Sequence, residues 1–348
     1  MIALAEKLQG PDQNIIFGAG EKQLAFIRSE LPGIACLSFP GFQPVYSEYL
    51  PQYIVILIQL PVLIYHIIRE HFILKKLIAL HSIDMVISDN RFGLWNKNIR
   101  TVYITHQPGI AFPPFFSILE FIGVYLHRKI IRRYSLCFIP DLPGEPNLTG
   151  RLSHGLKLPD NVRFIGILSR FSGGDQSHNF PEHKTGIITV ILSGPEPQRG
   201  ILEKKLTDIL KKRGQGAVIL GGKPHENIRT EVSGNIIYYS HTSRREMQEI
   251  ISGSDMIIAR AGYTTIMELV SLNCSAVLIP TPGQTEQEYL ATRLSHMGWF
   301  THIPQKKLNG TIHFDAVIPD RFENIIEQSR ELLDKALKEI SEEPQTDK

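Results

Sequence analysis

The sequence runs Asp255-Met-Ile-Ile-Ala-Arg260-Ala-Gly262-Tyr-Thr-Thr265-Ile-Met-Glu268-Leu-Val270, from an apolar run through a glycine turn into a helical pattern. The opening residues are of strand length, and the later apolar residues recur at helix spacing. A strand that leads through a tight turn into a helix is one unit of a parallel α/β sheet. Ligands bind beyond the carboxyl ends of such strands, where helix N-termini offer backbone N–H groups.

The next segment repeats this pattern, as Ala276-Val-Leu-Ile-Pro280-Thr-Pro282-Gly-Gln-Thr285-Glu-Gln287-Glu288. A carboxylate such as Glu268 can accept hydrogen bonds from both hydroxyls of a ribose, and Gln287 and Glu288 can bind neighbouring hydroxyls of a hexose. Both helix starts also fit a capping box, Thr265-x-x-Glu268 and Thr285-x-x-Glu288, which would only stabilise the helices. The residues alone therefore leave a binding role and a capping role open.

Similar β-branched runs extend in two series along the chain and predict two parallel sheets. A polar, glycine-rich stretch separates the series and predicts a linker. A sheet of this kind normally opens with a strand and a ligand-binding turn, whereas residues 1–8 form a helical pattern, so we expect the first strand and its loop to be missing. The predicted strands are residues 14–17, 34–38, 84–88, 101–105 and 136–139, then 187–192, 217–220, 235–239, 255–259, 276–280 and 299–303. The predicted domains are an N-terminal domain at 1–166, a linker at 167–184, a second domain at 185–318, and a C-terminal helix with its tail at 319–348.

Composition excludes several classes of protein. The 348 residues, 43% of them hydrophobic and 21% charged, suit two folded domains. With 37 basic and 35 acidic residues the formal net charge is only +2, which argues against nucleic acid as a partner. Cys36, Cys137 and Cys274 are too far apart for a CxxC site, so we expect no disulfide framework and no metal site. A cytoplasmic protein is predicted.

The two quoted segments together resemble the C-terminal signature of glycosyltransferase family 28, the MurG-like group. This resemblance implies a GT-B fold, in which two Rossmann-like domains face each other across a cleft and a C-terminal helix returns to the first domain. It also implies inverting, metal-independent transfer of a sugar from a UDP donor, without a cofactor. The group commonly carries paired glutamines where this chain has Gln287 and Glu288.

The resemblance also implies roles for individual residues on the donor side. Glu268 would bind the ribose, Gln287 and Glu288 the sugar, and Arg260 with the Thr264 region the diphosphate. Arg170 resembles an arginine that approaches the donor phosphates, a task suited to the fixed fork of a guanidinium; a surface arginine is the alternative. Backbone groups around His241 and Thr242 would lead into the uracil pocket. The full predicted donor side is Arg170, Ser193, Gly194, His241, Thr242, Arg260, Gly262, Thr264, Thr265, Glu268, Gln284, Gln287 and Glu288.

The first domain is expected to receive the acceptor. Residues 87–93 and 103–108 follow two predicted strands, are rich in polar groups, and resemble the acceptor-side loops of the same enzymes. An inverting transfer needs a base for the acceptor hydroxyl, and Asp89 and His106 are the candidates, although a lone histidine at a strand end is more often structural. Asn90, Arg91 and Gln107 complete the predicted acceptor side.

Two apolar segments bear on membrane contact. Residues 53–68 contain Gln59, Pro61 and His66 and are shorter than the ~20 residues of a spanning helix, which favours a buried or interfacial helix. Residues 110–125 are apolar and aromatic, and basic residues follow at 127–133, a pattern typical of a helix at an anionic membrane surface. A core helix with cations at its C-terminus is the alternative.

The sequence thus predicts a glycosyltransferase that moves a sugar, with N-acetylglucosamine as the candidate, from UDP to a lipid-linked or cell-envelope glycan acceptor. Peripheral contact with the cytoplasmic face of the inner membrane is part of this prediction. One alternative is a nucleotide-sugar-binding partner subunit without turnover. Another is a nucleotide-sugar epimerase, which would need acid and base groups around the sugar that the sequence does not identify.

Overall fold

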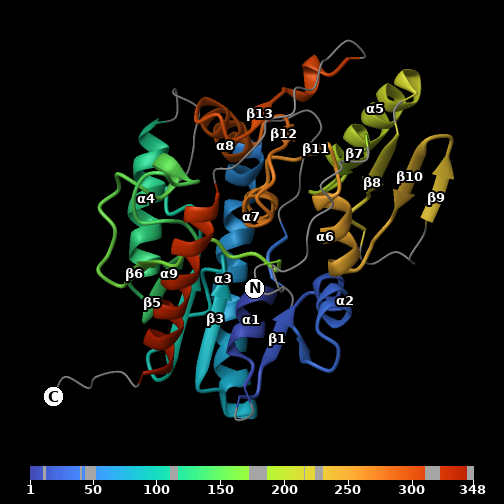
Figure 1. The fold of residues 1–348 in the computed structure, drawn as a ribbon. Helices are drawn as coiled ribbons and strands as arrows, with labels where there is room; N and C mark the ends of the chain where they lie inside the picture. The colour runs from blue at the N-terminus through green and yellow to red at the C-terminus, as the bar shows by residue number, and fades with distance from the viewer. Residues whose placement is uncertain are drawn as a thin grey trace. The chain divides into compact units, whose positions relative to one another are not determined.

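The computed structural model divides into two compact units (Figure 1). The first unit consists of residues 58–168 and 323–348, and the second consists of residues 2–57 and 169–322. The sequence had assigned residues 2–57 to the first domain. Part of the predicted membrane-contacting segment, the predicted linker from residue 172 and the end of the tail lie outside the residues that the structure describes. The described residues are 1–10, 13–39, 41–43, 52–109, 117–171, 186–214, 216–223, 230–309 and 322–342.

A seven-stranded sheet forms the centre of the second unit, in the order β13-β12-β11-β7-β8-β10-β9. Its strands pair in parallel, except that β9 runs antiparallel to β10 at the edge. The sequence predicted every strand of this sheet but β9, whose four residues are all exposed and show no apolar alternation. The strands are β7 Ile188–Ile191, β8 Ala217–Leu220, β9 Thr230–Ser233, β10 Ile236–Tyr239, β11 Met256–Ala259, β12 Val277–Leu278 and β13 Thr301–His302.

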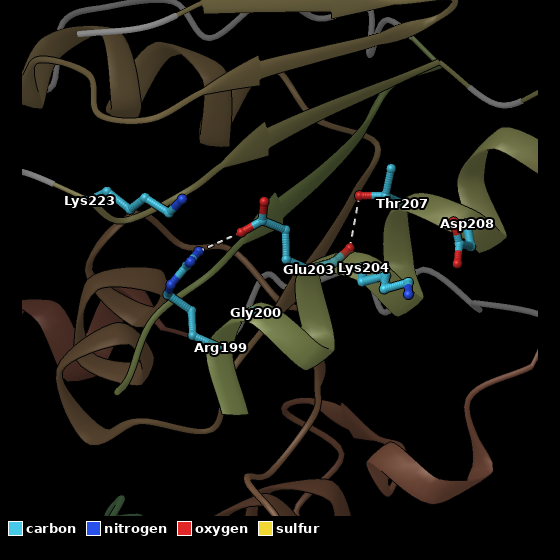
Figure 2. A pocket seen from close by; sticks show the side chains of 7 residues that line it. All are labelled: Arg199, Gly200, Glu203, Lys204, Thr207, Asp208 and Lys223. Carbon is cyan, nitrogen blue, oxygen red and sulfur yellow. Dashed lines mark hydrogen bonds and ion pairs between the residues drawn. The ribbon is translucent and has the colours of Figure 1, made fainter. Parts of the chain in front are cut away.

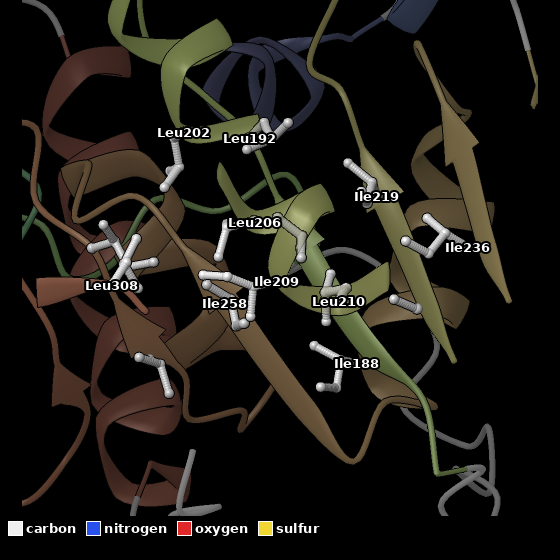
Figure 3. Packing of buried hydrophobic residues seen from close by; sticks show 14 residues of the cluster. Ile188, Leu192, Leu202, Leu206, Ile209, Leu210, Ile219, Ile236, Ile258 and Leu308 are labelled. Atoms are coloured by element: carbon white, nitrogen blue, oxygen red, sulfur yellow. The ribbon is translucent and has the colours of Figure 1, made fainter. Parts of the chain in front are cut away.

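The core of this sheet is apolar because parallel strands are covered on both faces. Every residue of β7 and β8 is buried. Helix α5 adds Leu202, Leu206 and Ile209, whose spacing places them on one helix face, and Figure 3 shows them meeting the side chains of the strands. The helices between the strands are α5 Gln198–Arg213, α6 Arg244–Ser252, α7 Tyr263–Ser271 and α8 Thr285–His296, and η3 Gln305–Lys307 follows the last strand.

The N-terminal part of the second unit is a small α/β layer. Strands β1 and β2 pair in parallel as a separate two-stranded sheet. The sequence had placed them in one sheet with residues 84–88. The usual strand order of a doubly wound sheet has a further strand between these two pieces, and the described residues contain none that pairs with both β1 and β3. The elements are α1 Ile2–Leu8, β1 Ile16–Ala19, α2 Glu21–Glu30 and β2 Ala35–Ser38.

The first unit holds a four-stranded parallel sheet in the order β3-β4-β5-β6. Its short last strand, β6, was not predicted. The C-terminal helix α9 belongs to this unit and packs closely against Gly166. A Cβ atom added to Gly166 would lie only 2.3 Å from the Cα of Ser329 in α9. Arg163 adds an ion pair to Glu339 of α9 at 2.9 Å. The elements are α3 Gln52–His81, β3 Met85–Asp89, β4 Arg100–Ile104, α4 Ser117–Ile131, β5 Leu136–Ile139, η2 Gly150–Leu152, β6 Val162–Phe164 and α9 Glu323–Ser341.

Helix α3 is longer than the sequence predicted. It runs for 30 residues, because Gln59, Pro61 and His66 do not end it. Among the described residues, its part Leu57–His81 is the one helix long and apolar enough to cross a membrane by length and composition alone. Only 11% of its most apolar stretch is buried, so of the two predicted alternatives the buried helix is wrong for this stretch, and the interfacial helix stays a prediction.

Candidate functional site

The start of α7 lies at the carboxyl end of β11, where a ligand site was expected. Gly262 is the N-cap residue, in an extended conformation, and it has no side chain that could cap the helix. Thr265 is therefore the third helical residue and is buried, so the capping-box alternative for Thr265 and Glu268 is wrong. Thr264 is exposed beside the N-terminus. The N–H groups of the first turn have no acceptor within the helix and favour an anion.

Glu268 lies further along α7 and is buried. Its Oε1 atom is 2.8 Å from Nε of Arg170, an ion pair. Burial raises the pKa of Glu268, and the charge of Arg170 opposes this rise. Only 15% of the Arg170 side chain is exposed, so Arg170 is not a surface arginine. The residues predicted for the ribose and for the phosphates thus contact each other.

This ion pair belongs to a larger charge cluster within the second unit, formed by Glu6, Glu30, Arg170, Arg244 and Glu268. Glu30 Oε1 is 3.5 Å from Nη1 of Arg170, and Glu30 Oε2 accepts a hydrogen bond of 3.1 Å from Nε of Arg244. Arg244 also pairs with Glu6, with Nη2 and Oε1 2.6 Å apart.

Glu6, Glu30 and Arg244 were not predicted as site residues, although the sequence carries a signal for Glu30 and Arg244. Arg244 is the first residue of α6 and Glu30 the last residue of α2. The helix dipole disfavours a cation at the N-terminus and an anion at the C-terminus. Each charge is therefore in an unfavourable helix position, which points to a partner elsewhere in the fold.

His241 and Thr242 lie next to this charge cluster, at the start of α6. The His241 ring contacts the Phe26 ring of α2 edge-on, with centroids 6.0 Å apart. Burial lowers the pKa of His241; the charge of Glu30 raises it and that of Arg170 lowers it further. The hydroxyl of Thr242 donates to the carboxylate of Glu246.

Arg260 is buried and is held by four oxygens of the second unit. Its guanidinium donates to the carbonyls of Ile279, Pro280 and Gln198 and to Oε1 of Gln305, the last two at 2.6 Å. Burial lowers the pKa of Arg260 to about 10. These contacts give Arg260 a bracing role between the loops after β7, β12 and β13; its predicted role at the diphosphate stays a prediction.

The side chains of Gln287 and Glu288 fold back onto the turn before α8. Oε1 of Gln287 accepts a hydrogen bond of 2.9 Å from the backbone of Thr281, and Oε1 of Glu288 accepts one of 3.0 Å from Gly283. Gln284 is the N-cap residue and its side chain forms no cap, so the second capping-box alternative is also wrong. Both predicted sugar-binding residues therefore order the turn that precedes their own helix.

The loop after β7 carries Ser193, which is half-buried, and Gly194, which is exposed with φ +93°. A pocket of about 330 Å³ opens along α5 (Figure 2). Arg199 at this pocket is neutralised by Glu196 and Glu203, at 2.5 and 2.6 Å. No residue of the predicted donor side lines the pocket, so it does not define the donor site. Its lining residues are Arg199, Gly200, Glu203, Lys204, Thr207, Asp208 and Lys223.

On the predicted acceptor side, the ends of β3 and β4 meet at Asn90. Asn90 has φ +51°, and its backbone N–H donates to the Ile104 carbonyl at 2.9 Å. Its Oδ1 lies 3.1 Å from the Tyr103 hydroxyl and 3.3 Å from the Thr105 hydroxyl. Asp89, directly before it, is exposed. The structure thus brings the two predicted acceptor loops together.

The remaining acceptor-side residues differ in their surroundings. Arg91 forms an ion pair of 2.9 Å with the buried Glu70 of α3, which anchors the loop. His106 and Gln107 are half-buried, and the backbone of Gln107 donates to the Thr105 hydroxyl at 3.3 Å. Tyr103 in turn contacts Nε2 of His127 at 2.9 Å.

The prediction that residues 127–133 form a basic surface is wrong for His127. It is buried, and burial lowers its pKa to about 4, so it does not belong to a charged surface. On the exposed side of α4, Lys129 lies 4.7 Å from the centroid of the Tyr125 ring. The cations at residues 128, 129, 132 and 133 remain candidates for membrane contact.

Comparison with known proteins supports the resemblance seen in the second half. Residues 201–345 match the glycosyltransferase family 28 C-terminal domain. The UDP-N-acetylglucosamine--N-acetylmuramyl-(pentapeptide) pyrophosphoryl-undecaprenol N-acetylglucosamine transferase of Caldanaerobacter subterraneus is 36% identical over 94 residues, 26% of this chain and 25% of that protein. The Bacillus subtilis protein of the same name is 28% identical over 168 residues, 46% of this chain and 43% of that protein. The chain thus spans less than half the length of these relatives, and the predicted family resemblance is confirmed.

Solved structures confirm the predicted GT-B fold. The glycotransferase of kitacinnamycin has a TM-score of 0.61 at 12% identity and covers 98% of this chain and 94% of its own. SnogD from Streptomyces nogalater has a TM-score of 0.59 at 13% identity, with the same coverage. SsfS6 from Streptomyces sp. SF2575, complexed with thymidine diphosphate, has a TM-score of 0.50 at 14% identity and covers 97% of this chain and 90% of its own.

Proposed function

We propose, on the premise that residues 201–345 form a glycosyltransferase family 28 C-terminal domain, that this protein transfers a sugar from a UDP donor to a lipid-linked or cell-envelope glycan. N-acetylglucosamine is the proposed sugar, since it is named in the activity of two relatives. The observation that carries the proposal is the start of α7 at the end of β11, where the N-cap residue is Gly262, with Glu268 and Arg170 paired beside it.

In the proposed reaction the acceptor hydroxyl attacks the anomeric carbon, and UDP leaves with inversion. Charge that develops on the diphosphate would be stabilised by the first-turn N–H groups of α7, by the Thr264 hydroxyl and by Arg170. Glu268 would accept hydrogen bonds from the ribose. The proposal involves no metal and no cofactor. Asp89, exposed at the end of β3, is the proposed base, with His106 as the second candidate.

The first unit supports the proposed lipid-linked acceptor. Helix α3 exposes Ile58, Tyr65 and Phe72, and helix α4 exposes 74% of Phe121. Exposed apolar residues of this size on helices are typical of an interaction surface, and cations beside them favour anionic lipids. We therefore include peripheral contact with the cytoplasmic face of the inner membrane in the proposal.

A second candidate function is a nucleotide-sugar-binding partner subunit without turnover. It shares the start of α7 and the pair of Glu268 and Arg170 with the transferase, because both candidates bind a UDP-sugar at this place. The two candidates differ in one measurable property. Both bind UDP-sugars, whereas only the transferase releases UDP in the presence of an acceptor.

The test is a thermal-shift series with UDP and UDP-sugars, followed by a UDP-release assay with a lipid-linked acceptor. A ligand that binds only the native state raises the melting temperature. The variant Glu268→Gln should lose the shift with UDP, since a ribose-binding carboxylate would be gone. The control is Glu249→Gln, at an exposed ion pair of α6. No shift with any uridine nucleotide would refute both candidate functions, and a shift without UDP release would leave only the second.

A further inference from the structure

Glu30 is the shared member of the charge cluster. The cluster contains three carboxylates and two guanidinium groups. Arg170 has a close partner in Glu268, at 2.8 Å, and Arg244 has one in Glu6, at 2.6 Å. Glu30 bridges the two arginines with its two oxygens, at 3.5 and 3.1 Å. Each arginine would thus keep a carboxylate partner if Glu30 left.

The position between the two arginines has the chemistry of a phosphate site. Guanidinium groups bind carboxylate and phosphate oxygens through the same kind of charge-assisted hydrogen bond, so the two arginines that hold Glu30 also offer suitable donors for a phosphate group. The place is shielded, because only 4% of the Glu30 side chain is exposed. Arg244 also donates to the backbone carbonyl of Arg170 at 3.3 Å, which holds the two arginines together independently of Glu30.

Glu30 is also in an unfavourable position within its own helix. It is the last residue of α2, where the helix dipole disfavours an anion. It adds the third negative charge to a cluster that has two positive ones. An anion that is held against these two effects is easier to displace than one in a balanced pair.

Resting on the proposed function, we propose that Arg170 and Arg244 form an anion subsite for a phosphate of the donor nucleotide, and that Glu30 is a tethered competitor for this subsite. Donor binding then requires the end of α2 to move away from the arginines. The contact of Phe26 with the His241 ring, and its ring centroid 5.8 Å from the Arg170 guanidinium, belong to the same closed arrangement. The N-terminal segment thereby sets the affinity for the donor.

The test compares Glu30→Gln with Glu21→Gln, which removes an exposed carboxylate from the same helix. Affinities for UDP and for inorganic pyrophosphate are measured by titration calorimetry at fixed ionic strength. Glu30→Gln should bind both about tenfold more tightly, a change of about 1.4 kcal/mol, and Glu21→Gln should match the wild type. The gain should disappear in the double variant Glu30→Gln with Arg244→Gln, because the subsite has lost one of its arginines.

The outcomes separate the inference from the function on which it rests. If the wild type binds UDP and Glu30→Gln binds it equally or more weakly, the inference is wrong and the proposed function stands. If Glu30→Gln gains affinity for pyrophosphate while no variant binds a uridine nucleotide, the anion subsite is supported and the proposed function is refuted. If no variant binds either probe, both fail. A melting-temperature measurement on each variant distinguishes a binding effect from a loss of folding.

Discussion

Arg260 carries its charge into the interior of the second unit, where four oxygens of the protein hold it. A buried guanidinium that is removed leaves these acceptors without a donor, and each unsatisfied buried group costs about 1–3 kcal/mol. We expect Arg260→Met to lower the free energy of unfolding by about 3 kcal/mol or more. Urea unfolding of this variant measures the change.

The matched control is Arg245→Met, because 85% of the Arg245 side chain is exposed and its partner Glu249 is exposed too. A change within about 0.5 kcal/mol is expected there. If the two variants were equally stable, the bracing role of Arg260 would be wrong.

His127 makes the stability of the first unit depend on pH. Burial lowers its pKa from 6.5 to about 4, so between these values the unfolded chain binds a proton that the folded protein does not. The contribution of His127 therefore falls as the pH falls from 6.5 to about 4, by roughly 3 kcal/mol in total. Urea unfolding at a series of pH values measures it, and His127→Gln should remove this part of the dependence. An unchanged slope in that variant would contradict the prediction.

At the scale of elements, the close approach of α9 to Gly166 provides a direct test of packing. Gly166 has φ +71°, and an added Cβ would lie 2.3 Å from the Cα of Ser329. Gly155 has nearly the same φ, +70°, with nothing within 4 Å of the added atom. Gly155→Ala should lower the free energy of unfolding by about 1–2 kcal/mol, because alanine disfavours the left-handed conformation. Gly166→Ala should lower it further, because the added Cβ also displaces α9.

Denaturant unfolding gives the difference between these two alanine variants. Limited proteolysis adds a local measurement, since a displaced α9 should be cleaved between residues 323 and 342 in Gly166→Ala only. Equal stability of the two variants would contradict the prediction, because it would show that α9 can move away from the added Cβ without a loss of stability.

A second prediction at the scale of elements concerns membrane contact through the exposed apolar residues of helix α4. Phe121 on α4 is 74% exposed, and burying an aromatic side chain of this kind contributes about 1.5–3 kcal/mol. Phe121→Asp should weaken binding to phosphatidylglycerol vesicles by about tenfold or more. The control is Ile201→Asp on α5, another exposed apolar residue, which belongs to the second unit. Equal vesicle binding in co-sedimentation by both variants and the wild type would exclude α4 as the contact.

For the whole molecule, regular patterns predicted the strands and local chemistry predicted their ends. Residues 136–139 and 217–220 were predicted at the bounds of β5 and β8, because a short apolar run with polar residues on either side has few alternatives. The start of α7 followed from the turn at Gly262. The sequence pattern did not show which residues far apart in the chain form ion pairs with each other.

The charge cluster shows why the rest was out of reach. Glu30 and Arg244 are 214 positions apart, and nothing in the sequence around either one identifies the other. The same holds for Glu268, whose contact with Arg170 replaces the capping role that its spacing suggested. The charged and polar residues of the proposed donor side could be predicted from the sequence. Which of these charges form ion pairs with each other is visible only in the tertiary structure.

The division of the first unit between residues 58–168 and 323–348 has a consequence for how the protein is made. The ribosome releases the four-stranded sheet long before it releases α9, with more than 150 residues of the second unit emerging in between. The surface around Gly166 therefore stays exposed during synthesis until α9 has emerged and can pack against it. A stall or premature stop codon late in the message would leave that surface exposed to chaperones and proteases, although most of the chain had already been synthesised.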